Sequence, residues 1–508
     1  MTSPDFEPLP CSRPHAKRTV TVIVKTLSML MLLSANLFGA ELEAIDPLVR
    51  VVDLNVGEEQ EITLSDGSTA TVKLLALEEH RDPIRLAVRS SDLKLLVNGE
   101  EVHLRGGSYL LPLPVGEVKI DCPVTKGLNS NGTPAFWGLK KDARFRLWPA
   151  ESPLIRPGTM IYPVKQDWLA TRTWFDNEPV DGGNTVIKKI YYHSGLDIGA
   201  SEGLVEVIAA TDGLVVQRGE EILEGHADGK PTAARADVVY LLDGRGWYYR
   251  YSHLKEIDPA IQTGNVIKMG TRIGVAGKEG ASGGWSHLHF EIKSEQPSGE
   301  WGTQAGYAIM REICIRDEGL EIIANARPAH FIVAGQETEL DGTRSWSAAG
   351  DLNYEWQFDD GSVERSARFA KVYPQPGFFT ETLKVTDAAG NVDYDFASVV
   401  VLDPNDMEHY PPSLNANFHP SQNLKIGDEI TFKVRGFRME GGEEHWDFGD
   451  GSPAQTTASP GNSEPHDPDG YAEIKHTYDK PGDYIVTVKR TSKDGYPATT
   501  RLHVAIGE

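Results

Sequence analysis

Cysteine is scarce in this chain, and its scarcity disfavours two kinds of structure. The 508 residues contain three cysteines, and none of them stands in a Cys-x-x-Cys pair. A cysteine-ligated zinc site is therefore disfavoured, because such sites use closely spaced cysteine pairs. Cys122 and Cys314 lie in segments that we interpret as different domains, so we expect no disulfide between them.

Clusters of positive charge are also missing. Lysine and arginine number 50 against 74 aspartates and glutamates, which gives a formal net charge of −24. Contacts with nucleic-acid phosphates need clustered Lys and Arg side chains, and no basic run occurs after residue 25. We therefore expect no nucleic acid among the partners. A hydrophobic content of 40% is that of a folded protein rather than a disordered one.

Long apolar runs are rare, and one stretch alone is apolar enough to engage a membrane. Residues 26–40 (TLSMLMLLSANLFGA) follow the basic residues Lys17 and Arg18. The stretch has the length of a signal-peptide core and is shorter than the roughly 20 residues that span a bilayer. We predict a signal peptide over 1–40 and an exported protein, in the periplasm, the cell envelope or the medium. Bulky Phe38 makes a poor cleavage site, so an uncleaved anchor is the alternative.

The length of the chain predicts several domains, because one hydrophobic core rarely serves this many residues. Residues 45–155 consist of short alternating runs separated by turn residues. The pair Asn98-Gly99 between two such runs is a strong hairpin signal. We predict an N-terminal β domain whose role no motif indicates, and we interpret the isolated His80 and His103 as structural.

The C-terminal part contains an internal repeat. The segment YEWQFDDGS (354–362) matches EHWDFGDGS (444–452), and in both copies an aromatic residue and Pro-Gly later lead into an alternating strand. Repetition of this kind across a proline-bearing linker predicts two domains. Alternating strands with frequent turns predict β-sandwiches, which we place at 326–403 and 412–508.

These two units resemble the PKD (polycystic kidney disease) domain, an immunoglobulin-like sandwich. The second copy carries the likeness in WDFGDGSP and HTYDKPGDYIVTV, and the first departs at Gln357, where the second has Asp447. The resemblance implies that Trp356 and Trp446 are core residues and that the Asp-Gly pairs are turns. It also implies a spacer or a module that binds polysaccharide or protein.

Two histidines stand two residues apart in the stretch GASGGWSHLHFEI (280–292). Side chains at i and i+2 of a strand point to the same face, so His287 and His289 share one space. An isolated His-x-His is most often a pair of ordinary strand histidines, and partners elsewhere must decide. Upstream, YYHSGLDIGAS offers His193 and Asp197, and RYSHL offers His253.

Zinc chemistry would use these residue types. Imidazole nitrogen and carboxylate oxygen both bind Zn²⁺, and a catalytic site takes three protein ligands and leaves one position for water. Two histidines and one aspartate would form such an open set. Two further histidines would then remain for proton transfer.

The ordered set of His-x-x-x-Asp, YSHL and HLHFE resembles the lysostaphin-type (LytM-like) zinc endopeptidases, over roughly residues 165–295. The resemblance implies Zn²⁺ as the cofactor, with three ligands and two catalytic histidines. By position the ligands would be His193, Asp197 and His289, and the catalytic residues would be His253 and His287. The implied reaction is hydrolysis of peptide bonds in peptidoglycan stem or cross-bridge peptides by zinc-bound water.

We therefore predict a mainly β, multidomain protein with a peptidase domain over 156–325. A connector helix near 303–317 is expected at the end of that domain. Two other functions stay open: a secreted protease that acts on extracellular structural protein, and a non-catalytic adaptor that activates another cell-wall hydrolase.

Several neighbouring polar residues have weaker assignments. Glu291 shares the face of His289 and is either an acceptor that orients this ring or a surface carboxylate. Tyr251 is expected to be a packed aromatic residue. His226 and Asp228 are expected to be solvated residues of a long insertion before His253.

Overall fold

The computed structural model describes residues 42–131, 136–180, 191–460 and 470–508. Residues Leu42–Glu508 form one compact unit. The predicted signal peptide at 1–40 lies outside the described residues. None of the helices in the described ranges is long and apolar enough to cross a membrane.

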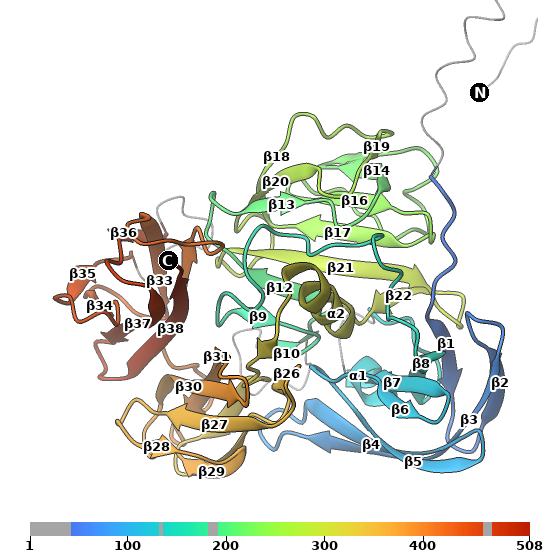
Figure 1. Ribbon diagram of the computed structural model, residues 1–508, viewed down its shortest axis with the longest axis horizontal. Coiled ribbons are helices and arrows are strands. Elements are labelled where there is room, and N and C mark those ends of the chain that lie inside the picture. The colour runs from blue at the N-terminus through green and yellow to red at the C-terminus, as the bar shows by residue number, and fades with distance from the viewer. Residues whose placement is uncertain (1–41, 132–135, 181–190, 461–469) are drawn as a thin grey trace, which may run out of the picture. The chain divides into compact units, whose positions relative to one another are not determined.

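The N-terminal domain consists of two four-stranded sheets, ordered β1-β8-β7-β6 and β2-β3-β4-β5 (blue in Figure 1). The predicted hairpin at Asn98-Gly99 joins β4 to β5, and both turn residues have a positive φ, as a tight hairpin turn requires. Its elements are β1 (Arg50–Leu54), β2 (Glu59–Thr63), β3 (Thr69–Arg81), β4 (Val88–Val97), β5 (Glu100–Gly106), β6 (Leu113–Val115), β7 (Val118–Thr125), α1 (Lys126–Asn131) and β8 (Ala143–Pro149).

The middle of the chain forms a large antiparallel sheet whose main path is β15-β14-β16-β17-β21-β12-β9. A smaller sheet, β13-β20-β18, accompanies it, and the long strand β21 runs through the region in Figure 1. Its strands are β9 (Trp174–Phe175), β10 (Pro179–Val180), β11 (Tyr191–Tyr192), β12 (Leu196–Gly199), β13 (Glu206–Ile208), β14 (Gly213–Arg218), β15 (Glu221–Ile222), β16 (Val239–Leu242), β17 (Tyr248–Ser252), β18 (Leu254–Ile257), β19 (Val266–Ile267), β20 (Arg272–Ala276), β21 (His287–Glu295) and β22 (Trp301–Gln304).

The predicted connector helix is present as α2 (Tyr307–Glu318). It starts later than expected because Trp301–Gln304 pair with β21 as strand β22. One face of α2 packs into the core of this region, where Cys314 is fully buried. Cys122 is buried in the core of the N-terminal domain, and the two cysteines are unpaired, as expected.

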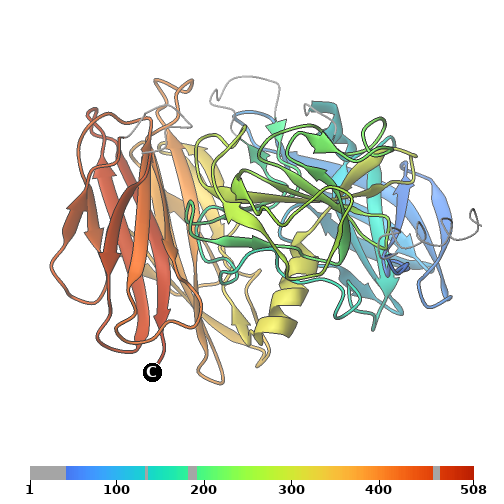
Figure 2. The ribbon, with the colours of Figure 1, turned by 90° about the horizontal axis from the view of Figure 1, so that it is seen from above.

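Two sandwiches follow, in orange and red in Figures 1 and 2. Trp356 and Trp446 are fully buried in their cores, as predicted. The strands are β23 (Ile322–Ile323), β24 (His330–Val333), β25 (Glu337–Asp341), β26 (Trp346–Ser347), β27 (Leu352–Gln357), β28 (Val363–Glu364), β29 (Arg368–Val372), β30 (Gly377–Asp387), β31 (Val392–Leu402), β32 (Ser413–His419), β33 (Ile430–Phe437), β34 (Glu444–Asp447), β35 (Gln455–Thr457), β36 (Ala472–His476), β37 (Gly482–Thr491) and β38 (Pro497–Ile506).

The two sandwiches are more closely joined than a linker between separate domains would suggest. Strand β30 of the first pairs in parallel with β38 of the second, where Phe378 lies opposite Ala498. One sheet therefore continues from the first sandwich into the second, in the order β24-β31-β30-β38-β37-β34-β35.

Arg327 ties the first sandwich to the middle region. Its guanidinium group pairs with Asp395 at 3.0 Å and donates to the main-chain carbonyl oxygens of Thr171, Arg172 and Trp174. The Arg327 side chain is 5% exposed and that of Asp395 1% exposed. A buried ion pair with this many hydrogen bonds costs much to break, because the remaining partners stay buried without compensation.

We expect Arg327→Ala to lower the free energy of unfolding by about 3–5 kcal/mol, since it leaves a buried carboxylate unpaired. Arg365→Ala is the matched control, because Arg365 pairs with Glu355 at the surface. That control should cost less than about 1 kcal/mol. Denaturant unfolding of the full chain measures both, and equal losses in the two variants would contradict a clamping role for Arg327.

Candidate metal and catalytic site

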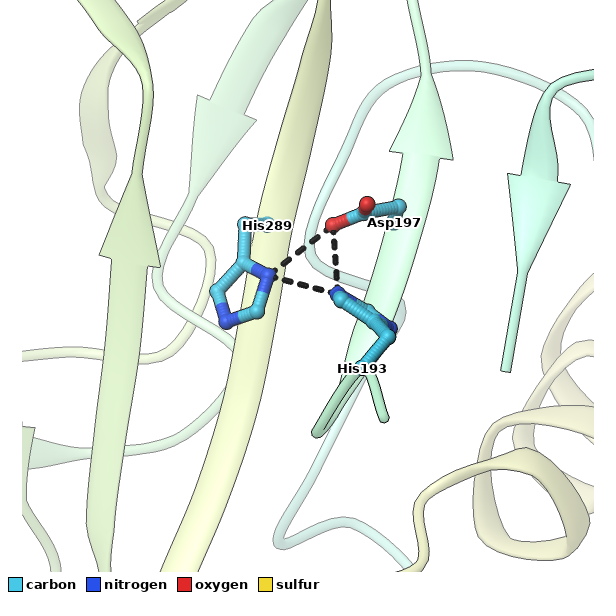
Figure 3. Close-up of side chains that lie close together, drawn as sticks. All are labelled: His193, Asp197 and His289. Carbon is cyan, nitrogen blue, oxygen red and sulfur yellow. Dashed lines mark hydrogen bonds and ion pairs between the residues drawn. The ribbon is translucent and has the colours of Figure 1, made fainter. Parts of the chain in front are cut away.

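Strand pairing brings the predicted ligands together. Asp197 in β12 lies opposite His289 in β21, and His193 lies three residues before the first residue of β12. His193 Nε2, Asp197 Oδ1 and His289 Nδ1 lie 2.9 Å from one another, pair by pair (Figure 3). All three side chains are buried, and the cluster could hold a metal ion.

The ligand atoms of this cluster are of the kinds that bind a cation. His193 Nδ1 lies 3.2 Å from the carbonyl oxygen of Asp176. A carbonyl can only accept, so Nδ1 carries the hydrogen and Nε2 presents a lone pair. The His193 Nε2 lone pair therefore converges with Asp197 Oδ1 and His289 Nδ1, and all three are atoms that can bind a cation. Tetrahedral Zn²⁺ with bonds of about 2.0–2.2 Å would need only slightly wider spacing. These residues fit zinc.

The electrostatics of the cluster follow from burial and mutual charge. Burial acts to lower the pKa of His193, but the adjacent Asp197 carboxylate outweighs it and raises the pKa. Burial acts to raise the pKa of Asp197, yet His193 and His287 lower it well below its usual range. Burial lowers the pKa of His289. Asp197 is therefore an anionic oxygen donor at neutral pH.

The other two predicted histidines lie beside this cluster. His287 shares β21 with His289, and its Nε2 lies 3.4 Å from Asp197 Oδ1. The rings of His253 and His287 are 4.6 Å apart between centroids. His253 follows β17 and has a φ of 66°, a left-handed conformation that is uncommon for histidine.

The unprotonated nitrogen of both rings is set by main-chain carbonyls. His253 Nδ1 donates to the carbonyl oxygen of Glu279 at 2.6 Å, and His287 Nδ1 donates to that of Trp285 at 3.0 Å. In the neutral rings Nε2 is therefore left as an acceptor. Burial lowers the pKa of His253 to about 3, so this ring is neutral at physiological pH.

Asp237 was not anticipated from the sequence. Its Oδ2 accepts from the backbone N–H of His253 at 3.0 Å and lies 3.4 Å from His253 Nδ1. Arg235 pairs with the same carboxylate. Burial opposes ionisation, but hydrogen bonds from His253 and Arg235 lower the pKa of Asp237. It ends the long insertion 220–237, and no local motif marks it.

The glycine-rich loop before β21 passes close to Asp237. A Cβ atom at Gly280 would collide with Arg235 Nη2 and lie 2.7 Å from Asp237 Oδ2, and Gly280 has a φ of 62°. The positive φ favours glycine there, and the nearby Asp237 carboxylate leaves little room for a side chain. The run of small residues thus permits the close approach of the loop to the carboxylate behind His253.

The weaker assignments have mixed outcomes. Glu291 is fully buried, so the surface alternative is wrong, and its Oε2 lies 3.9 Å from His289 Nε2, too far for a hydrogen bond. Tyr251 is a packed aromatic residue, as expected. His226 is partly buried against the Tyr248 hydroxyl and is not fully solvated, whereas Asp228 is exposed.

His80 lies in β3 and His103 in β5 of the N-terminal domain, and neither residue lines the cavity that contains the cluster.

The cluster and both further histidines line one cavity of about 610 Å³. Phe175 and Trp285 flank it with their rings 5.7 Å apart. Residues from all parts of the chain contribute to the wall, including Arg89 of the N-terminal domain, Phe378 of the first sandwich and Arg438 of the second.

We expect Zn²⁺ added to the metal-free full chain to raise its melting temperature, because a ligand that binds only the folded state stabilises it. The variants His193→Ala, Asp197→Ala and His289→Ala should lose both this shift and stoichiometric zinc, since each removes a ligand. His253→Ala and His287→Ala should keep them. Calorimetry and metal analysis by mass spectrometry check this. Zinc lost from His287→Ala but kept by His289→Ala would reverse the assignment.

Comparison with known families agrees with this geometry. Residues 191–299 match the family model of peptidase family M23, and the match includes all five polar residues of the site. Residues 322–401 and 415–504 each match a PKD domain model.

Similar solved structures are distant. Helicobacter pylori Csd3 in its hexagonal crystal is 13% identical over 53% of this chain and 79% of its own, with a TM-score of 0.21. Fibronectin(III)-like modules of Clostridium thermocellum CbhA are 10% identical over 36% of this chain and 93% of their own, with a TM-score of 0.14. Likenesses this weak support no conclusion. The family matches do: this chain contains a lysostaphin-type peptidase domain of family M23 followed by two PKD domains.

Proposed function

We propose that this protein is an exported zinc metalloendopeptidase that cleaves peptide bonds in the stem or cross-bridge peptides of peptidoglycan. The observation that carries the proposal is the convergence of three donor atoms beside two histidines in one cavity. The M23 match supports a peptide as the substrate. M23 and PKD domains are typical of extracellular or cell-envelope proteins, which supports export.

His193, Asp197 and His289 would hold Zn²⁺. When bound, the ion supplies a Lewis acid that polarises a carbonyl group and lowers the pKa of water. The protein contributes the orientation of these three donors. The Asp176 carbonyl fixes the ring of His193, and pairing of β12 with β21 fixes Asp197 against His289.

His253 and His287 would move protons and stabilise the oxyanion. His253 is neutral, and its Nε2 accepts a proton from the attacking water and returns one to the leaving amine. His287, once protonated at Nε2, donates a hydrogen bond to the tetrahedral oxyanion. Asp237 positions His253 through its backbone N–H and its ring.

The cavity beside the catalytic histidines has room for a short stretch of peptide. Its volume of about 610 Å³ is that of a small-ligand site, and the rings of Phe175 and Trp285 flank the catalytic residues. Peptides that contain glycine or D-alanine would enter more easily than bulky chains. This argument supports peptidoglycan peptides over the alternative substrate, an extracellular structural protein.

The non-catalytic alternative, an adaptor for another cell-wall hydrolase, is less well supported. An adaptor needs neither metal ligands nor proton-transfer groups. Here both sets are present, and three of the four histidine rings are held by main-chain carbonyls in the tautomer that catalysis needs. An arrangement this specific is unexpected for a module that only binds.

We expect His253→Ala and His287→Ala to lower the rate of peptide hydrolysis by about 10²–10⁴-fold while zinc content stays near stoichiometric. Asp237→Asn should lower it by about 10–100-fold, because it weakens the support of His253. Asp228→Asn, at an exposed position of the same insertion, is the control and should act like wild type. Wild-type rates in both histidine variants would remove the catalytic assignment.

The substrate class is tested by incubating the full chain with purified peptidoglycan and measuring newly released amines, with and without a chelator. We expect amines to appear, to stop with chelator and to return with Zn²⁺. Fibrous extracellular protein and intact peptidoglycan should be compared as substrates at the same enzyme concentration. Cleavage of the fibrous protein alone would favour the secreted-protease alternative, and cleavage of neither would favour the adaptor.

A further inference from the structure

The second PKD domain contacts the loop that leads into β21. Arg435 of β33 donates from Nη1 to the carbonyl oxygen of Gly284 at 2.8 Å. The hydroxyl oxygen of Tyr471, just before β36, accepts from the backbone N–H of Ser286 at 2.8 Å. Residues 284 and 286 are thus held from outside the M23 region, one on each side of Trp285.

The same loop fixes a catalytic histidine of the proposed function. Trp285 stacks on the ring of His287, with centroids 3.7 Å apart and planes 16° apart, and its carbonyl oxygen accepts from His287 Nδ1. A displacement of Trp285 therefore moves or rotates the His287 ring. The position of His287 Nε2 depends on where this loop lies.

Two adjacent glycines stand in this loop. Gly283 and Gly284 both have a positive φ, a conformation that glycine adopts at the least cost. Its internal support comes from Ser282, whose hydroxyl donates to the carbonyl of Lys278 and accepts from the N–H of Gly284. Within the peptidase region, the backbone N–H of Ala200 also donates to the carbonyl oxygen of Ser286 at 3.2 Å. Arg435 and Tyr471 add support from the second PKD domain.

Tyr471 is in turn anchored by a buried polar network. Its hydroxyl donates to Asn415 Oδ1 at 2.8 Å, and Asn415 Nδ2 donates to Thr173 Oγ1 at 3.2 Å. Asn417 accepts from the Ser201 hydroxyl at 2.9 Å. The network therefore joins β32 to segments beside β9 and β12, and its partners fix the Tyr471 hydroxyl in place.

The second PKD domain also forms part of the cavity wall. Asn415, Phe437 and Arg438 line the cavity that contains His287 and the metal cluster. Asn415 lies in β32, and Phe437 and Arg435 lie in β33, so the sheet β32-β33-β36 supplies wall residues as well as one contact to the loop.

We propose that the second PKD domain is an integral part of the peptidase active site, in which Tyr471 and Arg435 are positioning residues for the loop that carries Trp285 and His287. The proposal rests on the proposed function as far as hydrolysis is concerned. A PKD domain that served only as a spacer would leave the chemistry of a small substrate unaffected by these two residues. An integral domain makes that chemistry depend on them.

Tyr471→Phe in the full chain is the sharpest variant, because it removes one hydroxyl and keeps the ring. We expect kcat for a short soluble peptide to fall about 10–100-fold with KM little changed, since a misplaced His287 weakens the transition state more than substrate binding. Zinc content should stay stoichiometric. Tyr484→Phe is the matched control, because that hydroxyl donates to Lys480 within the same domain, and it should retain the wild-type rate.

A second measurement is independent of activity. In protein with ¹⁵N-labelled histidine, the resonances of His287 should shift or broaden in Tyr471→Phe and not in Tyr484→Phe, while those of His226 stay unchanged. Unchanged His287 signals in Tyr471→Phe, or a kcat within twofold of wild type, would overturn the positioning role. If wild type hydrolyses no peptide, the proposed function fails, and the histidine spectrum still decides the positioning role.

Discussion

The antiparallel pairing of β12 with β21 is the interaction on which the site depends. Its register places Asp197 opposite His289 and Gly199 opposite His287, so one carboxylate and two imidazoles reach the same face. His193 joins them from the turn before β12. Three atoms that can each donate an electron pair to a cation therefore lie 2.9 Å apart in a buried place. The fold thus builds a cluster that could hold a metal ion.

Hydrogen bonds from histidine ring nitrogens to main-chain carbonyl oxygens determine which nitrogen of each ring can accept or bind. Such bonds assign the tautomers of His193, His253 and His287, because a carbonyl oxygen cannot donate. The roles of these rings are thus set by backbone segments around the strands. Two of those segments, at Glu279 and Trp285, belong to the glycine-rich loop, which has contacts with Asp237 on one side and the second PKD domain on the other.

Much of this arrangement could be predicted from the sequence where the information is local. The five polar residues of the site stand in short motifs, and the strand parity of His287 and His289 indicates a shared face. The repeat indicated two β-sandwiches, and the resemblance to the PKD domain implied that Trp356 and Trp446 are core residues, where the structure buries both. The Asn98-Gly99 hairpin could also be predicted, because it depends on adjacent residues. The absence of a disulfide between Cys122 and Cys314 could be predicted because it follows from the number and positions of the cysteines.

The rest depends on contacts between distant segments. The burial of Glu291 results from packing of β17 and β22 on β21, which parity cannot reveal. Asp237 acts on His253 from the end of an insertion that carries no motif. Tyr471 contacts Ser286, which lies 185 residues earlier in the sequence. The proline-bearing linker suggested independent domains, whereas in the structure both sandwiches share a cavity wall with the peptidase region.

Anomalous X-ray scattering at the zinc edge, from crystals of the full chain grown with Zn²⁺, tests the central claim most directly. The account predicts one strong peak within about 2.0–2.2 Å of His193 Nε2, Asp197 Oδ1 and His289 Nδ1, with neither His253 nor His287 bonded to it. A peak bonded to His253 or His287, or no peak among the three donors, would contradict it.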